Sequence, residues 1–154
     1  MNMYKEIMPG VFVRHLNRHE DRRGWLVEAF REDELPEGFR PVMAYVSSTQ
    51  QGVVRGPHEH KEQTDGFVFL SGKFLLCLWE NRSGYPPAEI RMEVGEHAPT
   101  FVIVPPGVVH AYKNIGEKEA WILNVPNALY GGWGRQNPVD EIRHEENPDS
   151  PFRV

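Results

Sequence analysis

Glycine and proline interrupt this chain so often that long helices are not expected. The 14 glycines and 13 prolines divide the sequence into short apolar segments, and none of them keeps the 3.6-residue periodicity of an amphipathic helix. The segments are rich in Val, Phe, Leu and Ile and are bounded by turn-forming residues, which is typical of β-strands. Many short strands joined by close turns predict an all-β protein, either a sandwich or a barrel.

Ten segments show this pattern. They are residues 10–16, 24–30, 41–49, 52–60, 64–72, 73–79, 89–94, 100–106, 108–114 and 120–125. Residues 31–38 are expected to carry one short helical turn. The length predicts a single domain over residues 1–154, with its core from about 10 to 125 and a polar, irregular tail from about 131 to 154. We expect this tail to pack on the domain itself or on a neighbouring subunit.

Charge and cysteine content exclude several partners. The net charge is −5, and the basic residues are scattered among acidic ones, so the positive face that nucleic acid requires is not expected. The one cysteine, Cys77, lies in the apolar run "FLLCLW" and is expected to be a small buried hydrophobe. We find neither a signal-peptide pattern nor a window of about 20 apolar residues. We therefore expect a cytoplasmic protein without a membrane or nucleic-acid partner.

The stretch "GVVRGPHEHKEQTDGFVFLSG" contains the strongest chemical signal. In an extended strand, residues two apart point to the same face, so His58 and His60 are expected to lie side by side. Asp65 follows, and His110 comes later in "PPGVVHAYKN". Three histidines and a carboxylate suit Fe, Mn, Ni, Zn or Cu. For the other histidines, we expect surface or hydrogen-bonded positions: His15, His19, His97 and His144.

This arrangement resembles the two motifs of the cupin superfamily. The first motif is matched at Gly52, His58, His60 and Gly72, with Asp65 where glutamate is usual. The second is matched at Pro105, Gly107, His110 and Asn114. The resemblance implies the cupin jelly-roll, which is a double-stranded β-helix barrel, and many cupins keep this fold without a metal.

Further segments resemble the branch of cupins that contains dTDP-4-dehydrorhamnose 3,5-epimerase and related dTDP-sugar isomerases. They are "DRRGWLVEAF", "SSTQQGVVRGPH", "PPGVVHAY", "NALYGG" and "NPVDEI". The resemblance implies an isomerase that moves a proton next to the C4 ketone of a nucleotide-linked 4-keto-6-deoxysugar, in deoxysugar or surface-polysaccharide biosynthesis. It also implies a homodimer through an exchanged N-terminal strand and, in this function, no cofactor.

Such a reaction needs a base on one face of the sugar, an acid on the other and cations for the diphosphate. By resemblance, His58 is the base and Tyr130 is the acid. Imidazole suits the first role because it titrates near neutrality. The expected substrate-binding set is Arg23, Glu28, Tyr45, Arg55, His60 and His110, in which Arg23 and Arg55 grip phosphates.

The sequence departs from the epimerase pattern at several positions. Asp65 stands where the family has a lysine that stabilises the enolate, and Met43 and Tyr45 replace a glutamine–asparagine pair. The C-terminal segment that supplies the family's carboxylate partner for the base has no match. His58 is therefore expected to lack that partner unless Asp65 or a neighbour takes its place.

Two alternatives follow from these departures. A divalent transition metal held by His58, His60, Asp65 and His110 would make the protein a metal-dependent cupin of another chemistry, such as a free-sugar isomerase or an oxygenase. A ligand-binding cupin without turnover is the other alternative. The run "RGPHEHK" also resembles dTDP-sugar 3,4-ketoisomerases, in which the histidine pair moves protons. His58 cannot be both ligand and base, because a metal-bound nitrogen has no lone pair left for a proton.

Overall fold

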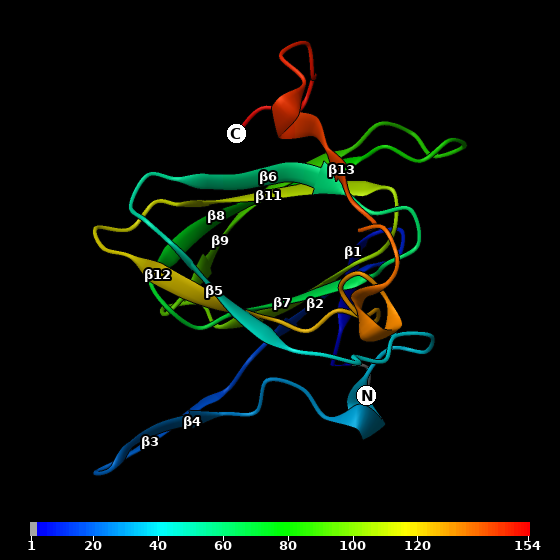
Figure 1. Ribbon diagram of the computed structural model, residues 1–154. Coiled ribbons are helices and arrows are strands. Elements are labelled where there is room, and N and C mark those ends of the chain that lie inside the picture. The colour runs from blue at the N-terminus through cyan, green and yellow to red at the C-terminus, as the bar shows by residue number, and fades with distance from the viewer. Residues whose placement is uncertain (1–2) are drawn as a thin grey trace.

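The barrel consists of two antiparallel β-sheets that face each other, as the computed structural model of residues 3–154 shows (Figure 1). The prediction of an all-β cupin barrel is confirmed. The helices of these residues are single 3₁₀ turns, and none has the length and hydrophobicity needed to cross a lipid bilayer. The first of them, η1 (Glu32–Glu34), is the short turn expected near residue 31.

The larger sheet has six strands in the order β1-β2-β10-β7-β12-β5. Their bounds are Lys5–Met8 for β1, Val11–His15 for β2, Thr100–Val104 for β10, Asp65–Phe69 for β7, Ala120–Asn124 for β12 and Tyr45–Thr49 for β5. All neighbours are antiparallel. The first strand pairs with β2 of the same chain.

The smaller sheet has five strands in the order β13-β6-β11-β8-β9. Their bounds are Ile142–Arg143 for β13, Val54–Glu59 for β6, Val108–Asn114 for β11, Lys73–Glu80 for β8 and Glu89–Gly95 for β9. The edge strand β13 belongs to the C-terminal tail, so part of this tail is incorporated into the barrel.

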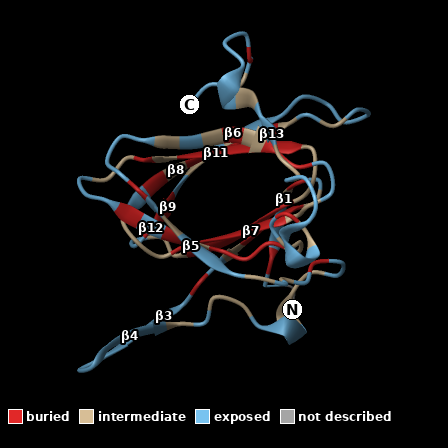
Figure 2. Ribbon diagram, in the orientation of Figure 1, coloured by how far each residue is buried: buried red, intermediate tan, exposed pale blue. Residues whose placement is uncertain are grey.

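A hairpin projects away from the barrel (Figure 1). It is formed by β3 (Arg18–Asp21) and β4 (Gly24–Val27), which pair only with each other among the described strands. Nearly all of its residues are exposed, in contrast to the buried central strands of both sheets (Figure 2). Trp25 and Leu26 are among the exposed apolar side chains.

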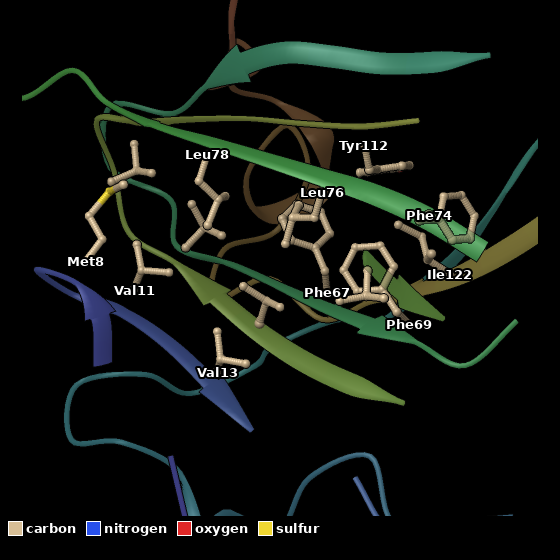
Figure 3. Packing of buried hydrophobic residues seen from close by; sticks show 14 of the residues in the cluster. Met8, Val11, Val13, Phe67, Phe69, Phe74, Leu76, Leu78, Tyr112 and Ile122 are labelled. Atoms are coloured by element: carbon tan, nitrogen blue, oxygen red, sulfur yellow. The ribbon is translucent and has the colours of Figure 1, made fainter. Parts of the chain in front are cut away.

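The hydrophobic core fills the space between the sheets (Figure 3). Alternation along β8 explains its composition, because Phe74, Leu76 and Leu78 point inward while Cys77 and Trp79 pack in a separate cluster with Phe152 of the tail. Each fully buried side chain of this size contributes about 1.5–3 kcal/mol to folding. Cys77 is a free, fully buried thiol, as expected.

All ten expected strands are present, within a few residues of their expected bounds. Three strands lie outside these ten segments: β1, which falls in the N-terminal strand that the resemblance implied, and β3 and β13, which were missed. The sequences of these strands are "KEIM", "RHED" and "IR", which are too short or too polar to show the alternation that marks a strand.

Candidate active site

The candidate site is a pocket of about 810 Å³, enclosed by both sheets and by the C-terminal segment. His58, His60 and Asp65 line its interior, and Arg143 and Glu145 of the tail line it next to His58. The core reaches the site through Phe67, whose ring centroid lies 5.2 Å from that of His110.

A β-bulge in β6 determines which of its side chains face this pocket. His58 pairs with His110 and Arg55 pairs with Tyr112, so two residues of β6, Gly56 and Pro57, oppose one residue of β11. In a regular strand, residues 55 and 58 would point to opposite faces, but the extra residue changes the alternation and both line the pocket. Gly56 has φ +86°, and a Cβ there would lie 2.6 Å from the His110 carbonyl oxygen. Only glycine fits.

The predicted histidine cluster forms inside the pocket. His58 and His60 lie on the same face, with ring centroids 5.9 Å apart, and His110 lies 4.6 Å from His58. Asp65 is the first residue of β7, and its side chain is buried between His60 and His110. Its Oδ2 accepts a hydrogen bond from His60 Nε2 at 2.8 Å, and its Oδ1 accepts one from Gln63 Nε2 at 2.7 Å.

Backbone carbonyls determine the tautomers of two of these histidines. His60 Nδ1 donates to the Asp140 carbonyl, and His110 Nδ1 donates to the Val108 carbonyl at 3.1 Å. A carbonyl oxygen only accepts, so both Nδ1 atoms carry hydrogens. His60 donates from both nitrogens and is therefore an imidazolium. His110 Nε2 lies 3.1 Å from Asp65 Oδ2 but makes no hydrogen bond.

The environment shifts the pKa values of these groups in different directions. Burial, assisted by the neighbouring His110 and His60, lowers the pKa of His58 to about 2. Burial also acts to lower the pKa of His60, but the Asp65 carboxylate and Asp140 outweigh it and raise that pKa to about 9. Burial acts to raise the pKa of Asp65, but His110 and His60 hold it well below its usual value. His58 is therefore a neutral imidazole next to a charged His60–Asp65 pair.

The cluster also fits a divalent metal in its residue types. His58, His60, Asp65 and His110 each offer one ligand atom, and these atoms all lie within 4.8 Å of one another. An N₃O set of this kind suits Zn, Fe, Mn, Ni or Cu. A bound metal and the His60–Asp65 hydrogen bond exclude each other. As a metal ligand, His60 Nε2 would give its lone pair to the metal, whereas in the hydrogen bond the same nitrogen carries a hydrogen.

A second polar group lines the pocket beside the histidines. Asn124 Nδ2 donates to Ser47 Oγ at 3.1 Å, and Ser47 Oγ lies 3.4 Å from the Tyr112 hydroxyl. Arg55 lines the same wall, where its Nε donates to Thr49 Oγ1 at 3.0 Å and its Nη2 donates to the Ser48 carbonyl at 2.5 Å. These two hydrogen bonds to β5 fix the position of the Arg55 guanidinium.

The structure brings most of the expected catalytic and substrate-binding residues together. Tyr45 and Tyr130 both line the pocket, and Tyr130 is 56% exposed at its rim. His110 lies behind the pocket wall, in contact with Asp65. Arg23 and Glu28 do not line this pocket. Arg23 is on the projecting hairpin, where it pairs with Asp21.

Several residues of the site were missed by the sequence analysis. Gln63 holds Asp65, and the carboxylate of Asp140 accepts hydrogen bonds from the backbone N–H groups of residues 61, 62 and 63. Glu141 and Glu145 line the pocket as well. They belong to the acidic run "VDEIRHEE", which has the composition of a solvated tail. The only sequence signal that connected this run with the site was the resemblance of the overlapping segment "NPVDEI" to the epimerases.

Comparison with known proteins relates the chain to glycan biosynthesis. Residues 19–132 match the family described as the polysaccharide biosynthesis C-terminal domain. The chain is 37% identical over 123 residues to the probable low-salt glycan biosynthesis epimerase Agl13 of Haloferax volcanii, and the match covers 78% of this chain and 79% of that protein.

Solved structures of similar fold are sugar-nucleotide enzymes. A dTDP sugar isomerase from Desulfovibrio desulfuricans G20 superposes with a TM-score of 0.81 at 18% identity, covering 94% of this chain and 90% of that one. A dTDP-4-dehydrorhamnose 3,5-epimerase from Sulfolobus tokodaii superposes with a TM-score of 0.75 at 19% identity, covering 97% and 86%. These structural likenesses support the cupin fold.

Proposed function

Since the chain belongs to the family of polysaccharide biosynthesis C-terminal domains, we propose that it epimerises a nucleotide-linked 4-keto-6-deoxysugar, with dTDP as the nucleotide. It is an enzyme of the sugar epimerase and isomerase type, as its named relatives are. These relatives favour epimerisation over a metal-dependent cupin of another chemistry and over a binding protein without turnover.

The single observation that carries this proposal is the position of His58 in the wall of a pocket of about 810 Å³ that His60 and Asp65 also line. A base must have a free lone pair at neutral pH, and burial together with the neighbouring His110 and His60 lowers the pKa of His58, so its imidazole is neutral there. His58 removes the proton from the carbon next to the C4 ketone, so that the C–H bond breaks and its electron pair forms an enolate. The His60 imidazolium lies next to His58, with its ring centroid 5.9 Å away.

Epimerisation is completed when a proton returns to the same carbon from the opposite face of the sugar. Tyr130 is the proposed donor, since it lines the same pocket as His58 and belongs to a different segment, the one after β12. Its phenolate then regains a proton, and His58 loses one to solvent, so the enzyme returns to its starting state. Arg55 is the proposed contact for the diphosphate, because its forked guanidinium matches phosphate oxygens.

Solvent exchange tests this function directly. We expect the wild-type protein, incubated in D₂O with dTDP-4-keto-6-deoxyglucose, to incorporate deuterium at C3 or C5. His58→Asn should abolish the exchange, whereas His97→Asn should keep it, because His97 is exposed and outside the pocket. No exchange by the wild type, or undiminished exchange by His58→Asn, would contradict the proposal.

A homodimer is part of this proposal and would explain where Arg23 lies. The hairpin that carries Arg23 projects from the barrel with Trp25 and Leu26 exposed (Figure 1), and a second subunit would cover these side chains. The partner's hairpin would then bring a cation to the pocket. This would also suit the pocket's electrostatics, because Arg55 and Arg143 are its only arginines or lysines among the lining residues.

Mixed dimers test this arrangement. We expect light scattering to give twice the monomer mass, and we expect Arg23→Ala and His58→Asn each to lose activity. Mixing the two inactive variants should restore part of it, because each heterodimer would contain one intact site. A monomer in solution, or no recovery after subunit exchange, would contradict the arrangement.

The proposed substrate and the buried free thiol of Cys77 both suit the reducing cytoplasm.

A further inference from the structure

The C-terminal segment returns to the strand that carries the proposed base. β13 pairs with β6, so that Arg143 lies opposite His58 and Ile142 lies opposite Glu59 (Figure 1). On its other side β6 pairs with β11, where His110 lies opposite His58. His58 therefore has the tail as a direct neighbour in the sheet.

Two carboxylates of this segment lie near the same ring nitrogen. His58 Nδ1 is 3.8 Å from Glu141 Oε1 and 3.9 Å from Glu145 Oε1. Both distances are slightly longer than a hydrogen bond, but both groups can only accept when ionised. The two glutamates are each two residues from Arg143, one on either side. Nδ1 of His58 thus faces hydrogen-bond acceptors.

The two glutamates differ in their other partners. Glu141 Oε2 pairs with Arg143 Nε at 2.8 Å, so its charge is largely compensated. Arg143 also lies 3.7 Å from Glu146. Among residues 3–154, Glu145 has an ion-pair contact with His58 alone. Its carboxylate is therefore the freer of the two to accept a hydrogen bond from His58.

Contacts on both sides hold this segment in position. Asp140 caps the backbone of residues 61–63 through three N–H groups at 2.8 to 2.9 Å. On the opposite face of β6, His144 Nε2 donates to the buried Glu59 at 3.0 Å, and Asn81 donates to the same oxygen at 2.9 Å. His144 also packs edge-on against Phe152. Glu141 directly follows the first anchor, Asp140, and Glu145 directly follows the second, His144, so both glutamates are positioned in advance.

We propose that Glu145, assisted by Glu141, is the positioning residue of His58. By accepting a hydrogen bond from Nδ1–H, it holds the imidazole in the tautomer whose lone pair is on Nε2, as a carboxylate does for the histidine base of other enzymes. The inference rests on the proposed function, in which His58 is the base. It gives the tail, which has the composition of a solvated segment, a role in catalysis.

Isosteric substitutions test the kinetic part. Glu145→Gln and the double variant Glu141→Gln/Glu145→Gln remove the charges with little change in volume. We expect kcat to fall about 10- to 100-fold while KM changes less than about threefold, because the substituted side chains orient the base and do not bind the sugar. Glu146→Gln is the matched control, since this neighbour is 70% exposed at its side chain and lies outside the pocket.

Nuclear magnetic resonance of the ring nitrogens tests the same inference without turnover. In protein labelled with ¹⁵N-histidine, we expect His58 of the wild type to carry its hydrogen on Nδ1. The double variant should shift His58 towards the Nε2–H tautomer, and Glu146→Gln should not. Assignment of the signals uses His58→Asn.

The outcomes separate this inference from the proposed function. If the wild type shows no exchange on dTDP-4-keto-6-deoxyglucose but its His58 tautomer depends on Glu145, the proposed function fails and the positioning role stands. An Nε2–H tautomer in the wild type would overturn the role of Glu145. The same conclusion would follow if the double variant kept both the wild-type tautomer and the wild-type kcat.

Discussion

The Nε2 atom of His60 donates a hydrogen bond of 2.8 Å to Oδ2 of Asp65, and this buried pair closes the inner end of the pocket. Asp140 engages the other nitrogen of His60, and Gln63 engages the other oxygen of Asp65. In the epimerases that the sequence resembles, a lysine is expected at the position of Asp65. Here the positive charge is carried by His60 and is neutralised within the pair.

This pair makes a prediction about stability and pH. The pKa of His60 is raised from 6.5 to about 9, so its stabilising contribution is complete below pH 6.5 and is lost as the pH rises through 9. Relative to His60→Gln, we expect the wild type to lose about 3 kcal/mol of unfolding free energy across this window. His58 does not contribute there, because its lowered pKa leaves it neutral in both states above pH 6.5.

Urea unfolding at a series of pH values measures this difference. The control is His97→Gln, since His97 is exposed and its replacement should leave the pH dependence of the wild type unchanged. Parallel curves for the wild type and His60→Gln would show that the His60–Asp65 pair is not charged as described.

The same pair predicts how the protein responds to metal. Because His60 Nε2 donates to Asp65, its lone pair is not free for a ligand bond, and we expect turnover to persist after treatment with a chelator. Metal analysis of protein purified without a nickel column checks this. A stoichiometric transition metal that is lost in His60→Ala would contradict the prediction and would remove His58 from the role of base.

The bulge at Gly56 predicts a local effect of substitution. In Gly56→Ala the new Cβ would lie 2.6 Å from the His110 carbonyl oxygen, so β6 must move away from β11 and shift Arg55 and His58. We expect a loss of about 2–4 kcal/mol of unfolding free energy, from the left-handed backbone and the steric contact together. The rate of substrate exchange should fall as well.

Gly84→Ala is the matched control for this substitution. Gly84 has φ +88°, close to that of Gly56, but nothing lies within 4 Å of its Cβ position. It should therefore cost about 1 kcal/mol, from the backbone conformation alone. Equal losses in the two variants would mean that the contact with His110 does not constrain the bulge.

The anchor of the tail makes a further prediction. His144→Ala leaves the buried Glu59 with Asn81 as its remaining side-chain donor and removes the ring contact with Phe152. We expect a loss of about 1–3 kcal/mol, because a buried acceptor loses a partner. Chemical unfolding measures it, and exposed His97→Ala should change stability by less than about 0.5 kcal/mol. No difference between the two variants would show that the tail is held by other contacts.

Local patterns in the sequence were sufficient for ten of the described strands and for part of the site. Alternation with period two depends only on neighbouring residues, so it predicted β8, the burial of Cys77 and the shared face of His58 and His60. The spacing of the histidines predicted their meeting with Asp65, and the resemblance predicted Tyr45, Arg55 and Tyr130 in the same pocket.

Tertiary structure alone decided which distant residues complete the site. His60 and Asp140 are 80 positions apart, and the short polar strand β13 has no pattern that would reveal its pairing with β6. That pairing, rather than any local preference, brings Glu141 and Glu145 to His58. In the same way, the outward course of the β3–β4 hairpin keeps Arg23 away from the pocket of its own chain. The sequence by itself determined most of the strands and the chemistry of the central histidines, because both depend on short-range spacing, whereas closure of the barrel determined the partners of these histidines.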